Sequence, residues 1–254
     1  MRAAICILLV ACGENQTPQP DPAPALPECL PDRDGAITAD ELPVALGVTA
    51  TYYVSRNVAI DNRDADIWDY DEERAGDDVI ALGPVALGAQ WYAPEFPTGQ
   101  FVVDGGIYHQ TEQALFLDGL ASETEAPKTL IRYDQPIPVL RFPLVDGDSF
   151  QATGTITQGT VMGLPFNGQD ELTVEVQGEG RIDLPYVRFS PTLRVLTHVV
   201  RRPSSGSPVV GRRTVGYLFE CFGEVARAES AVDEPNTDFT TAATLRRFAL
   251  GVKP

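Results

Sequence analysis

Hydrophobic and polar residues alternate along much of this chain in short runs rich in Val, Ile, Thr, Tyr and Phe, which are separated by Gly, Pro, Asn and Asp. The clearest run is 172–177, where Leu172, Val174 and Val176 alternate with polar residues. A period of two places one face of a strand in a core and the other in water. Such runs predict strands over 48–55, 85–92, 114–120, 129–133, 139–142, 150–161, 171–182, 192–202 and 212–222.

The last four runs are longer, and turn-like segments such as Pro-Ser-Ser-Gly-Ser-Pro at 203–208 join them, as in an antiparallel meander. Helical spacing occurs only in 39–46 and 240–250, and in the second segment Leu245 and Phe248 would share one side. We therefore expect a mainly β protein. Its architecture would be an antiparallel curved sheet, a partial barrel or a sandwich, with one or two short helices.

The first eleven residues have the layout of a cleaved export signal. Arg2 precedes an apolar run that is too short to cross a bilayer as a helix. The run ends in Leu-Val-Ala-Cys at 9–12, which resembles the lipobox of bacterial lipoproteins. The resemblance implies that Cys12 is acylated and becomes the first residue of the mature chain. A soluble secreted protein and a short membrane anchor are the alternatives.

The position after Cys12 also predicts a location. Gly13 and Glu14 follow the cysteine, and neither is the aspartate that retains bacterial lipoproteins at the inner membrane. We therefore expect a lipid anchor in the cell outer membrane, facing the periplasm or the cell surface. Proline occupies nearly every second position from Pro18 to Pro24, which favours an extended tether of roughly 50 Å at most. The predicted organisation is a signal peptide (1–11), a lipidated cysteine with its tether (12–28) and a β-rich globular domain (29–254).

The net charge limits which partners the protein can bind, and the cysteines indicate the compartment in which it folds. The chain has 36 acidic and 19 basic residues, a formal charge of −17, so we expect no nucleic-acid partner. Of four cysteines, Cys6 lies in the signal and Cys12 would carry lipid. Exported chains with two remaining cysteines often join them, which predicts a Cys29–Cys221 disulfide. Two buried thiols are the alternative.

One segment resembles a known ligand motif, the calcium loop of EF-hand and dockerin modules. Aligned on Gly35, the ligand positions fall on Asp32, Asp34, the carbonyl of Ala36 and Glu41. The resemblance implies a weak calcium site with these four residues as metal ligands.

The same segment departs from the calcium-loop pattern at the first ligand position, where Leu30 cannot coordinate a metal. A metal-free interpretation therefore stays open. Asp34-Gly35 is a turn signal, and Thr38 with Glu41 forms a capping box. A second acidic segment, 61–73, predicts a solvated loop anchored by an aromatic residue, with cation or basic-partner binding as the alternative.

Signatures of the common enzyme classes are missing from the sequence. It contains two histidines, His109 and His198, and no Gly-x-Ser-x-Gly, His-Glu-x-x-His or phosphate-binding glycine loop. We expect a non-catalytic protein without a required cofactor, which binds or scaffolds an envelope protein or holds an apolar small molecule. A calcium-stabilised adhesion or assembly module and a hydrolase of unrecognised type are the alternatives.

Four segments together resemble a group of uncharacterised lipoproteins from myxobacteria and related deltaproteobacteria: 31–35, 138–144, 180–185 and 220–227. The resemblance spans most of the chain after residue 28. It implies a shared location and a shared fold, and it implies no activity.

Overall fold

The computed structural model describes residues 28–63, 65–204 and 208–251. These residues form strands and two short 3-10 turns. The elements are β1 (Ala36–Ile37), β2 (Ala50–Ala59), β3 (Ile67–Asp69), β4 (Asp78–Leu82), β5 (Val85–Ala86), η1 (Leu87–Ala89), η2 (Ala93–Glu95), β6 (Phe101–Val103), β7 (Gly106–Gln110), β8 (Ala114–Ala121), β9 (Leu130–Arg141), β10 (Leu144–Val145), β11 (Ser149–Val161), β12 (Leu164–Leu184), β13 (Val187–Pro203), β14 (Val210–Phe219), β15 (Gly223–Glu229) and β16 (Thr241–Phe248).

The strands pair into one fourteen-stranded sheet and a two-stranded sheet of β1 and β10. The large sheet runs β4-β2-β16-β15-β14-β13-β12-β11-β9-β8-β7-β6-β5, and β3 pairs with β12. Its two edge strands, β4 and β5, are separated in the chain only by Gly83 and Pro84. The sheet thus bends until its edges are joined by the chain, although hydrogen bonds do not close it into a barrel.

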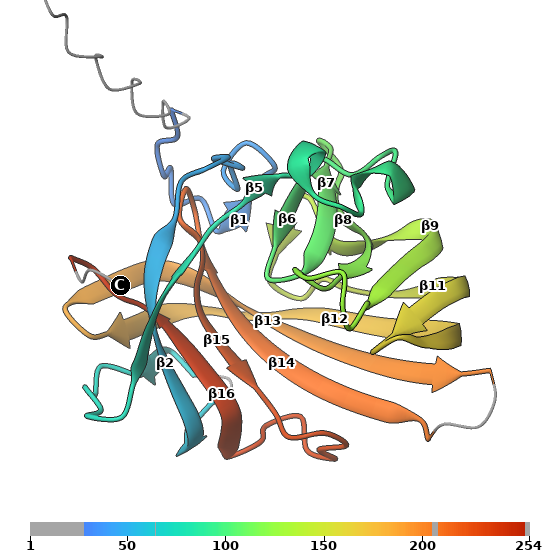
Figure 1. Ribbon diagram of the computed structural model, residues 1–254. Coiled ribbons are helices and arrows are strands. Elements are labelled where there is room, and N and C mark those ends of the chain that lie inside the picture. Colours follow the sequence, from blue (N-terminus) through green and yellow to red (C-terminus); the bar gives the residue numbers. More distant parts are fainter. Residues whose placement is uncertain (1–27, 64, 205–207, 252–254) are drawn as a thin grey trace, which may run out of the picture.

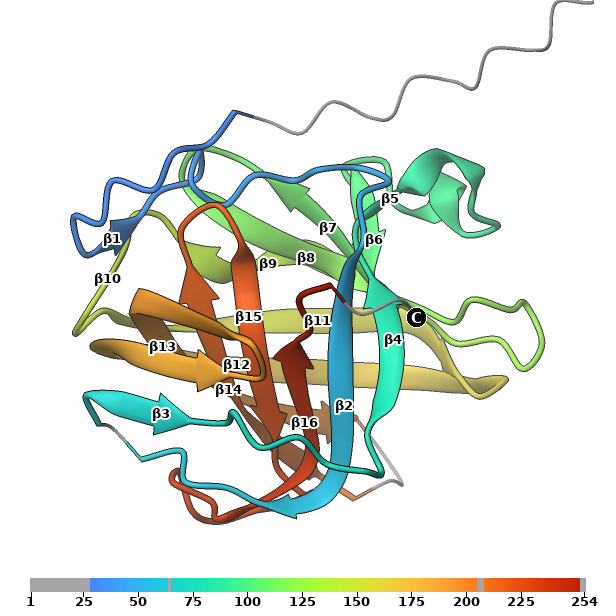
Figure 2. The ribbon, with the colours of Figure 1, turned by 90° about the vertical axis from the view of Figure 1, so that its left-hand side faces the viewer.

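Backbone pairing within the large sheet is sparsest between β9 and β11. The registered pairing between β9 and β11 is a single residue pair, Leu130 with Thr160. In Figures 1 and 2 the layer of β5 to β9 faces one side of the long strands β12 to β16. The predicted fold class, a mainly β protein with an antiparallel curved sheet, is confirmed.

The alternation in 172–177 is confirmed, but both faces of the central strands are partly covered. Leu172, Val174 and Val176 belong to a core on the side of β9, β1 and β10. On the opposite side Tyr217 belongs to a second core, which lies under β3. Because side chains leave a strand on alternate sides, neighbouring residues of β13 and β14 enter different cores.

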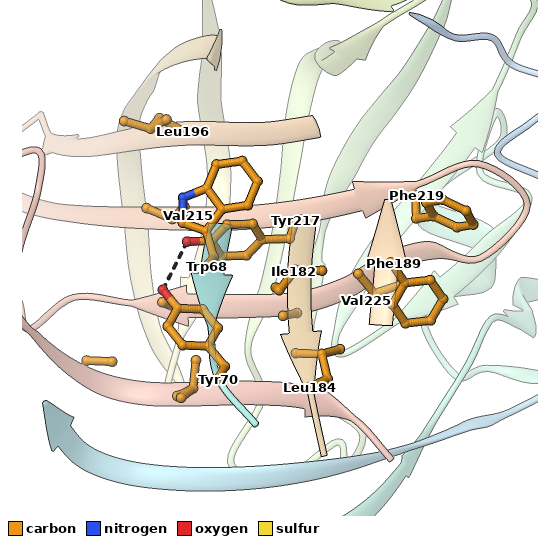
Figure 3. Close-up of a cluster of buried hydrophobic side chains, with 14 of the residues drawn as sticks. Trp68, Tyr70, Ile182, Leu184, Phe189, Leu196, Val215, Tyr217, Phe219 and Val225 are labelled. Atoms are coloured by element: carbon orange, nitrogen blue, oxygen red, sulfur yellow. Dashed lines mark hydrogen bonds between the residues drawn. The ribbon is translucent and has the colours of Figure 1, made fainter. Parts of the chain in front are cut away.

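The acidic segment 61–73 covers part of this second core. β3 pairs in parallel with β12, and the side chains of Trp68, in β3, and Tyr70, just after it, are buried. The hydroxyls of Tyr70 and Tyr217 share a 2.9 Å hydrogen bond, drawn in Figure 3. The Trp68 Nε1–H donates to the Arg63 carbonyl at 2.9 Å. Aromatic anchors therefore hold a segment whose carboxylates mostly face solvent.

Two fully buried arginines hold the same segment to the sheet. Arg194 donates to the carbonyl of Asn62 and forms an ion pair with Asp238 at 2.9 Å. Arg247 donates to the carbonyls of Tyr70, at 3.0 Å, and Glu72. Because a buried guanidinium needs partners for its donors, these contacts fix the course of the covering segment.

Both predicted helices are wrong. Residues 241–248 form β16 between β15 and β2, where Leu245 and Arg247 are buried on the same side of the strand. Ala249, the residue after the strand, is buried too. The buried arginine conceals this period of two in the sequence. In 39–46, Leu42 N–H reaches the Ala39 carbonyl at 3.2 Å, but Pro43 follows and cannot donate the next bond.

The predicted strand over 85–92 is also largely wrong, because only β5 is extended and the 3-10 turn η1 follows it. The two runs predicted at 129–133 and 139–142 are parts of one strand, β9. No helix long and apolar enough to cross a membrane occurs in the part of the chain that the structure describes.

Candidate functional site

The predicted disulfide is confirmed and fixes the beginning of the domain to the turn after β14. Cys29 and Cys221 are bonded with their Cα atoms 5.5 Å apart, across 192 residues of sequence. The Cys221 N–H also donates to the Glu41 carbonyl at 2.7 Å. Residues 29–41 are therefore held against the end of the long sheet by one covalent bond and by the backbone.

This attachment brings three carboxylates together. Oxygens of Asp32, Asp34 and Glu220 lie within 4.8 Å of one another. The Asp32 Oδ1 accepts from the Asp34 N–H at 3.1 Å, and the Asp34 Oδ1 accepts from the Ala36 N–H at 2.8 Å. Carboxylate oxygens gathered in this way are the ligands that calcium prefers.

Glu220 is the member of this group that sequence reasoning missed. Glu220 is only 2% exposed, and its Oε2 accepts a hydrogen bond from the Arg33 N–H at 2.9 Å. Burial raises the pKa of the Glu220 carboxyl, and the nearby charges of Glu41 and Asp32 raise it further. The signal that could have found it is its position beside Cys221, because the predicted disulfide places it next to the calcium-loop segment.

The other two predicted ligands have different roles in the structure. The Glu41 Oε2 accepts from the backbone N–H of Thr38 at 2.9 Å and from the Thr38 hydroxyl at 2.8 Å, as the capping-box interpretation expects. Ala36 lies in β1, and its N–H binds Asp34. The structure thus brings Asp32 and Asp34 together with Glu220, and Glu41 stays outside that group of three.

The segment carrying these carboxylates is itself well anchored. Ile37 is buried and pairs with Leu144 between β1 and β10. The Gln110 amide donates to the carbonyls of Ala39, at 2.9 Å, and Leu42, at 3.2 Å. The acidic loop is therefore presented on a rigid support rather than on a mobile arm.

Two cavities of about 160 Å³ lie elsewhere in the described residues, and both have polar or charged linings. The first is lined by Val54, Arg56, Ile80, Asp104, Arg227, Glu229, Thr244 and Arg246. The second is lined by Thr173, Glu175, Leu196, Thr197, His198, Arg213, Thr214, Val215 and Thr237. Sites for apolar ligands of drug size are larger, about 300–1,000 Å³, and mostly hydrophobic.

An ion cluster fills the wall beside the first cavity. Glu224 binds Arg227 at 2.7 Å and Arg246 at 2.6 Å, and Arg246 also contacts Asp104 at 3.3 Å. The two arginines lower the pKa of the Glu224 carboxyl against the opposing effect of its burial. The Arg246 guanidinium lies 5.4 Å from the centre of the Tyr52 ring. Arg227 and Arg246 therefore form ion pairs with carboxylates of the protein itself.

The two histidines lie in different surroundings. The His109 Nδ1 is 2.6 Å from the buried Asp118, whose other oxygen accepts from the Thr98 hydroxyl. The His109 ring stacks on Phe116. His198 lines the second cavity, where burial and the charge of Arg213 lower its pKa. His109 is thus held as a packed and oriented residue of β7.

Cys12, the predicted lipidation site, lies outside the described residues. No protein-family model, curated protein or solved structure matches the chain. The resemblance to myxobacterial lipoproteins therefore stays a prediction.

Proposed function

We propose that this chain is a lipid-anchored protein of the bacterial outer membrane with a non-catalytic binding or scaffolding role in the cell envelope. The observation that carries the proposal is the Cys29–Cys221 disulfide. Disulfides form and persist in oxidising compartments outside the cytosol, which agrees with an export signal over 1–11. The bond also fastens the end of the tether directly to the long strands.

The role that we propose rests on the surface of the domain. Neither cavity supports an apolar ligand, because each is small and polar or charged. A protein of the envelope is therefore the partner that we favour. The disulfide joins the end of the tether to the long antiparallel strands. The sheet would thereby hold such a partner at the membrane.

Anchoring is tested by Cys12→Ser, with Cys6→Ser as the matched control. In a bacterium that processes lipoproteins, the wild type and Cys6→Ser are expected in the detergent phase after Triton X-114 partition. Cys12→Ser is expected in the aqueous phase, because two or three acyl chains provide the membrane affinity at about 0.8 kcal/mol per buried methylene. A Cys12→Ser protein that still enters the detergent phase would contradict the proposal.

A second candidate role, a calcium-stabilised adhesion or assembly module, is favoured by the three converging carboxylates of Asp32, Asp34 and Glu220. Calcium would be held by this group and would clamp the acidic loop to the turn after β14. Because an ion bound only to the folded state stabilises it, millimolar calcium should raise the melting temperature. The site would belong to the weak, extracellular class of affinity.

Glu220→Gln tests the calcium clamp through two measurements, the stability without calcium and the response of the melting temperature to calcium. A carboxyl whose pKa is raised by folding destabilises the folded state once pH rises through its unfolded and folded pKa values. Without calcium at pH 7, Glu220→Gln should therefore stabilise the fold relative to the wild type, and this gain should vanish at pH 3. With calcium, the variant should lose the ion-dependent rise in melting temperature.

Asp40→Asn is the matched control for Glu220→Gln. Asp40 is an exposed acid of the same segment and lies outside the group of three. This variant should keep the calcium response of the wild type. An equal calcium response in the wild type, Asp40→Asn and Glu220→Gln would exclude the clamp.

A further inference from the structure

Four exposed hydrophobic residues lie on segments at the end of the domain where residue 28 lies. Leu30 is 88% exposed, Phe222 is 53% exposed, Leu46 is 46% exposed and Val85 is 42% exposed. We call these four residues the tether-side patch. Single exposed hydrophobic residues are ordinary, whereas larger exposed hydrophobic surfaces are typical of protein or membrane interaction sites.

Contacts between segments that are far apart in the sequence bring these residues to the same end of the domain. Leu30 follows Cys29 and Phe222 follows Cys221, so the disulfide holds these two residues near one another. Leu46 and Val85 come together because the Gly47 N–H donates to the Pro84 carbonyl at 2.8 Å. Figures 1 and 2 show the segment 28–47, β5 and the turn between β14 and β15 at the same end of the molecule.

Phe222 is held in place although half of it is exposed. Its ring lies 5.2 Å from that of Phe189, 5.8 Å from that of Phe219 and 6.2 Å from that of Phe248, measured between centroids. These neighbours restrict its rotamers before any partner arrives. Docking through Phe222 would therefore cost little conformational entropy.

We propose that the tether-side patch rests on the surface of the lipid bilayer that holds the anchor. This inference depends on the proposed lipid anchor at Cys12. Only sixteen residues, 13–28, separate that anchor from Cys29, and extended they span roughly 50 Å. So short a link holds the bilayer near the patch at a millimolar effective concentration, so weak apolar contact is enough for docking.

The chemistry of the patch suits a zwitterionic bilayer. Aromatic and aliphatic side chains at a protein tip enter the interfacial region of a membrane. The acids Asp32 and Asp34 lie beside Leu30 and would be repelled by anionic head groups. The surface thus fits phosphatidylcholine or phosphatidylethanolamine better than an anionic lipid.

Tryptophan quenching in vesicles tests the proposal. The lipidated full-length protein is reconstituted in phosphatidylcholine vesicles with or without bromine atoms on the upper acyl chain. Phe222→Trp adds a fluorophore inside the patch, and Leu30→Trp adds one at a residue with little packing to disturb. Met162→Trp is the control, because Met162 is 66% exposed in the turn between β11 and β12. Figures 1 and 2 show β11 and β12 apart from the end of the molecule that carries the patch.

Brominated lipid is expected to reduce the added emission of Phe222→Trp and Leu30→Trp about twofold, after subtraction of the signal of Trp68 and Trp91. Met162→Trp should keep its emission. Vesicle flotation separates the two hypotheses. Protein that floats without quenching at 222 and 30 is anchored but not docked, which overturns this inference alone. Protein that does not float overturns the anchor and the inference together.

Discussion

Replacing Arg247 with methionine should destabilise the fold by about 3–5 kcal/mol, because the change breaks a buried ion pair and leaves its partners unpaired. The Arg247 guanidinium is fully buried and pairs with Asp77, whose side chain is 6% exposed. It also donates hydrogen bonds to the Ser55 hydroxyl, at 3.2 Å, and to two backbone carbonyls of the segment that covers the core. Urea unfolding at pH 7 measures the loss.

Two variants sharpen this prediction. Arg56→Met removes an exposed arginine of β2 whose pairing with Asp78 is long, at 3.5 Å, and should change stability by less than about 1 kcal/mol. Adding Asp77→Asn to Arg247→Met should recover part of the loss, because the buried carboxylate is no longer left charged and alone. Equal effects of Arg247→Met and Arg56→Met would refute the structural role of Arg247.

Removing the disulfide should have a comparable effect. A crosslink across 192 residues is worth about 5 kcal/mol in the chain-entropy model, and measured losses are typically 2–5 kcal/mol. For a domain of this size, Cys29→Ser with Cys221→Ser should lower the melting temperature by roughly 5–15 °C. Differential scanning calorimetry of both proteins measures the difference.

Reductant provides the internal control for the disulfide. Dithiothreitol should lower the melting temperature of the wild type to that of the double variant and should leave the double variant unchanged. A wild-type melting temperature that does not respond to reductant, with the bond shown by mass to be reduced, would contradict the stabilising role.

The sequence predicts the fold class because its longest strands carry the simplest signal. In 172–177 the alternation is unbroken, and the strands β11 to β14 lie where the runs of β-branched residues lie. β15, residues 223–229, escapes the same reasoning because Glu, Ala and Arg dominate it. Pairing with β14 and β16 overrides the helical preference of these residues.

The candidate site was predictable only in part. Asp32 and Asp34 lie two residues apart in the sequence, so the calcium-loop resemblance finds them. Glu220 is distant in the sequence and is placed there by the disulfide, which the cysteine count also predicts. Glu41 illustrates the opposite case, since one carboxylate fits both a ligand position and a capping box, and in the structure it accepts the local capping-box hydrogen bonds from Thr38.

The buried arginines mark the limit of reasoning from pattern. Arg194 and Arg247 look like solvent-facing positions because arginine is seldom buried. Their partners, the carbonyls of the segment 61–73, come from a distant part of the chain and have no signature in the sequence. A period of two that includes a buried cation is therefore invisible until the fold is known.

The most direct test of the account is the mass of the N-terminal tryptic peptide of the membrane-bound protein after reduction. We predict a peptide that begins at Cys12, ends at Arg33 and carries the added mass of a diacylglyceryl group and an amide-linked acyl chain. An unmodified peptide that runs from Ala3 to Arg33 would show that the signal was neither cleaved nor acylated, and it would contradict the lipid-anchored function.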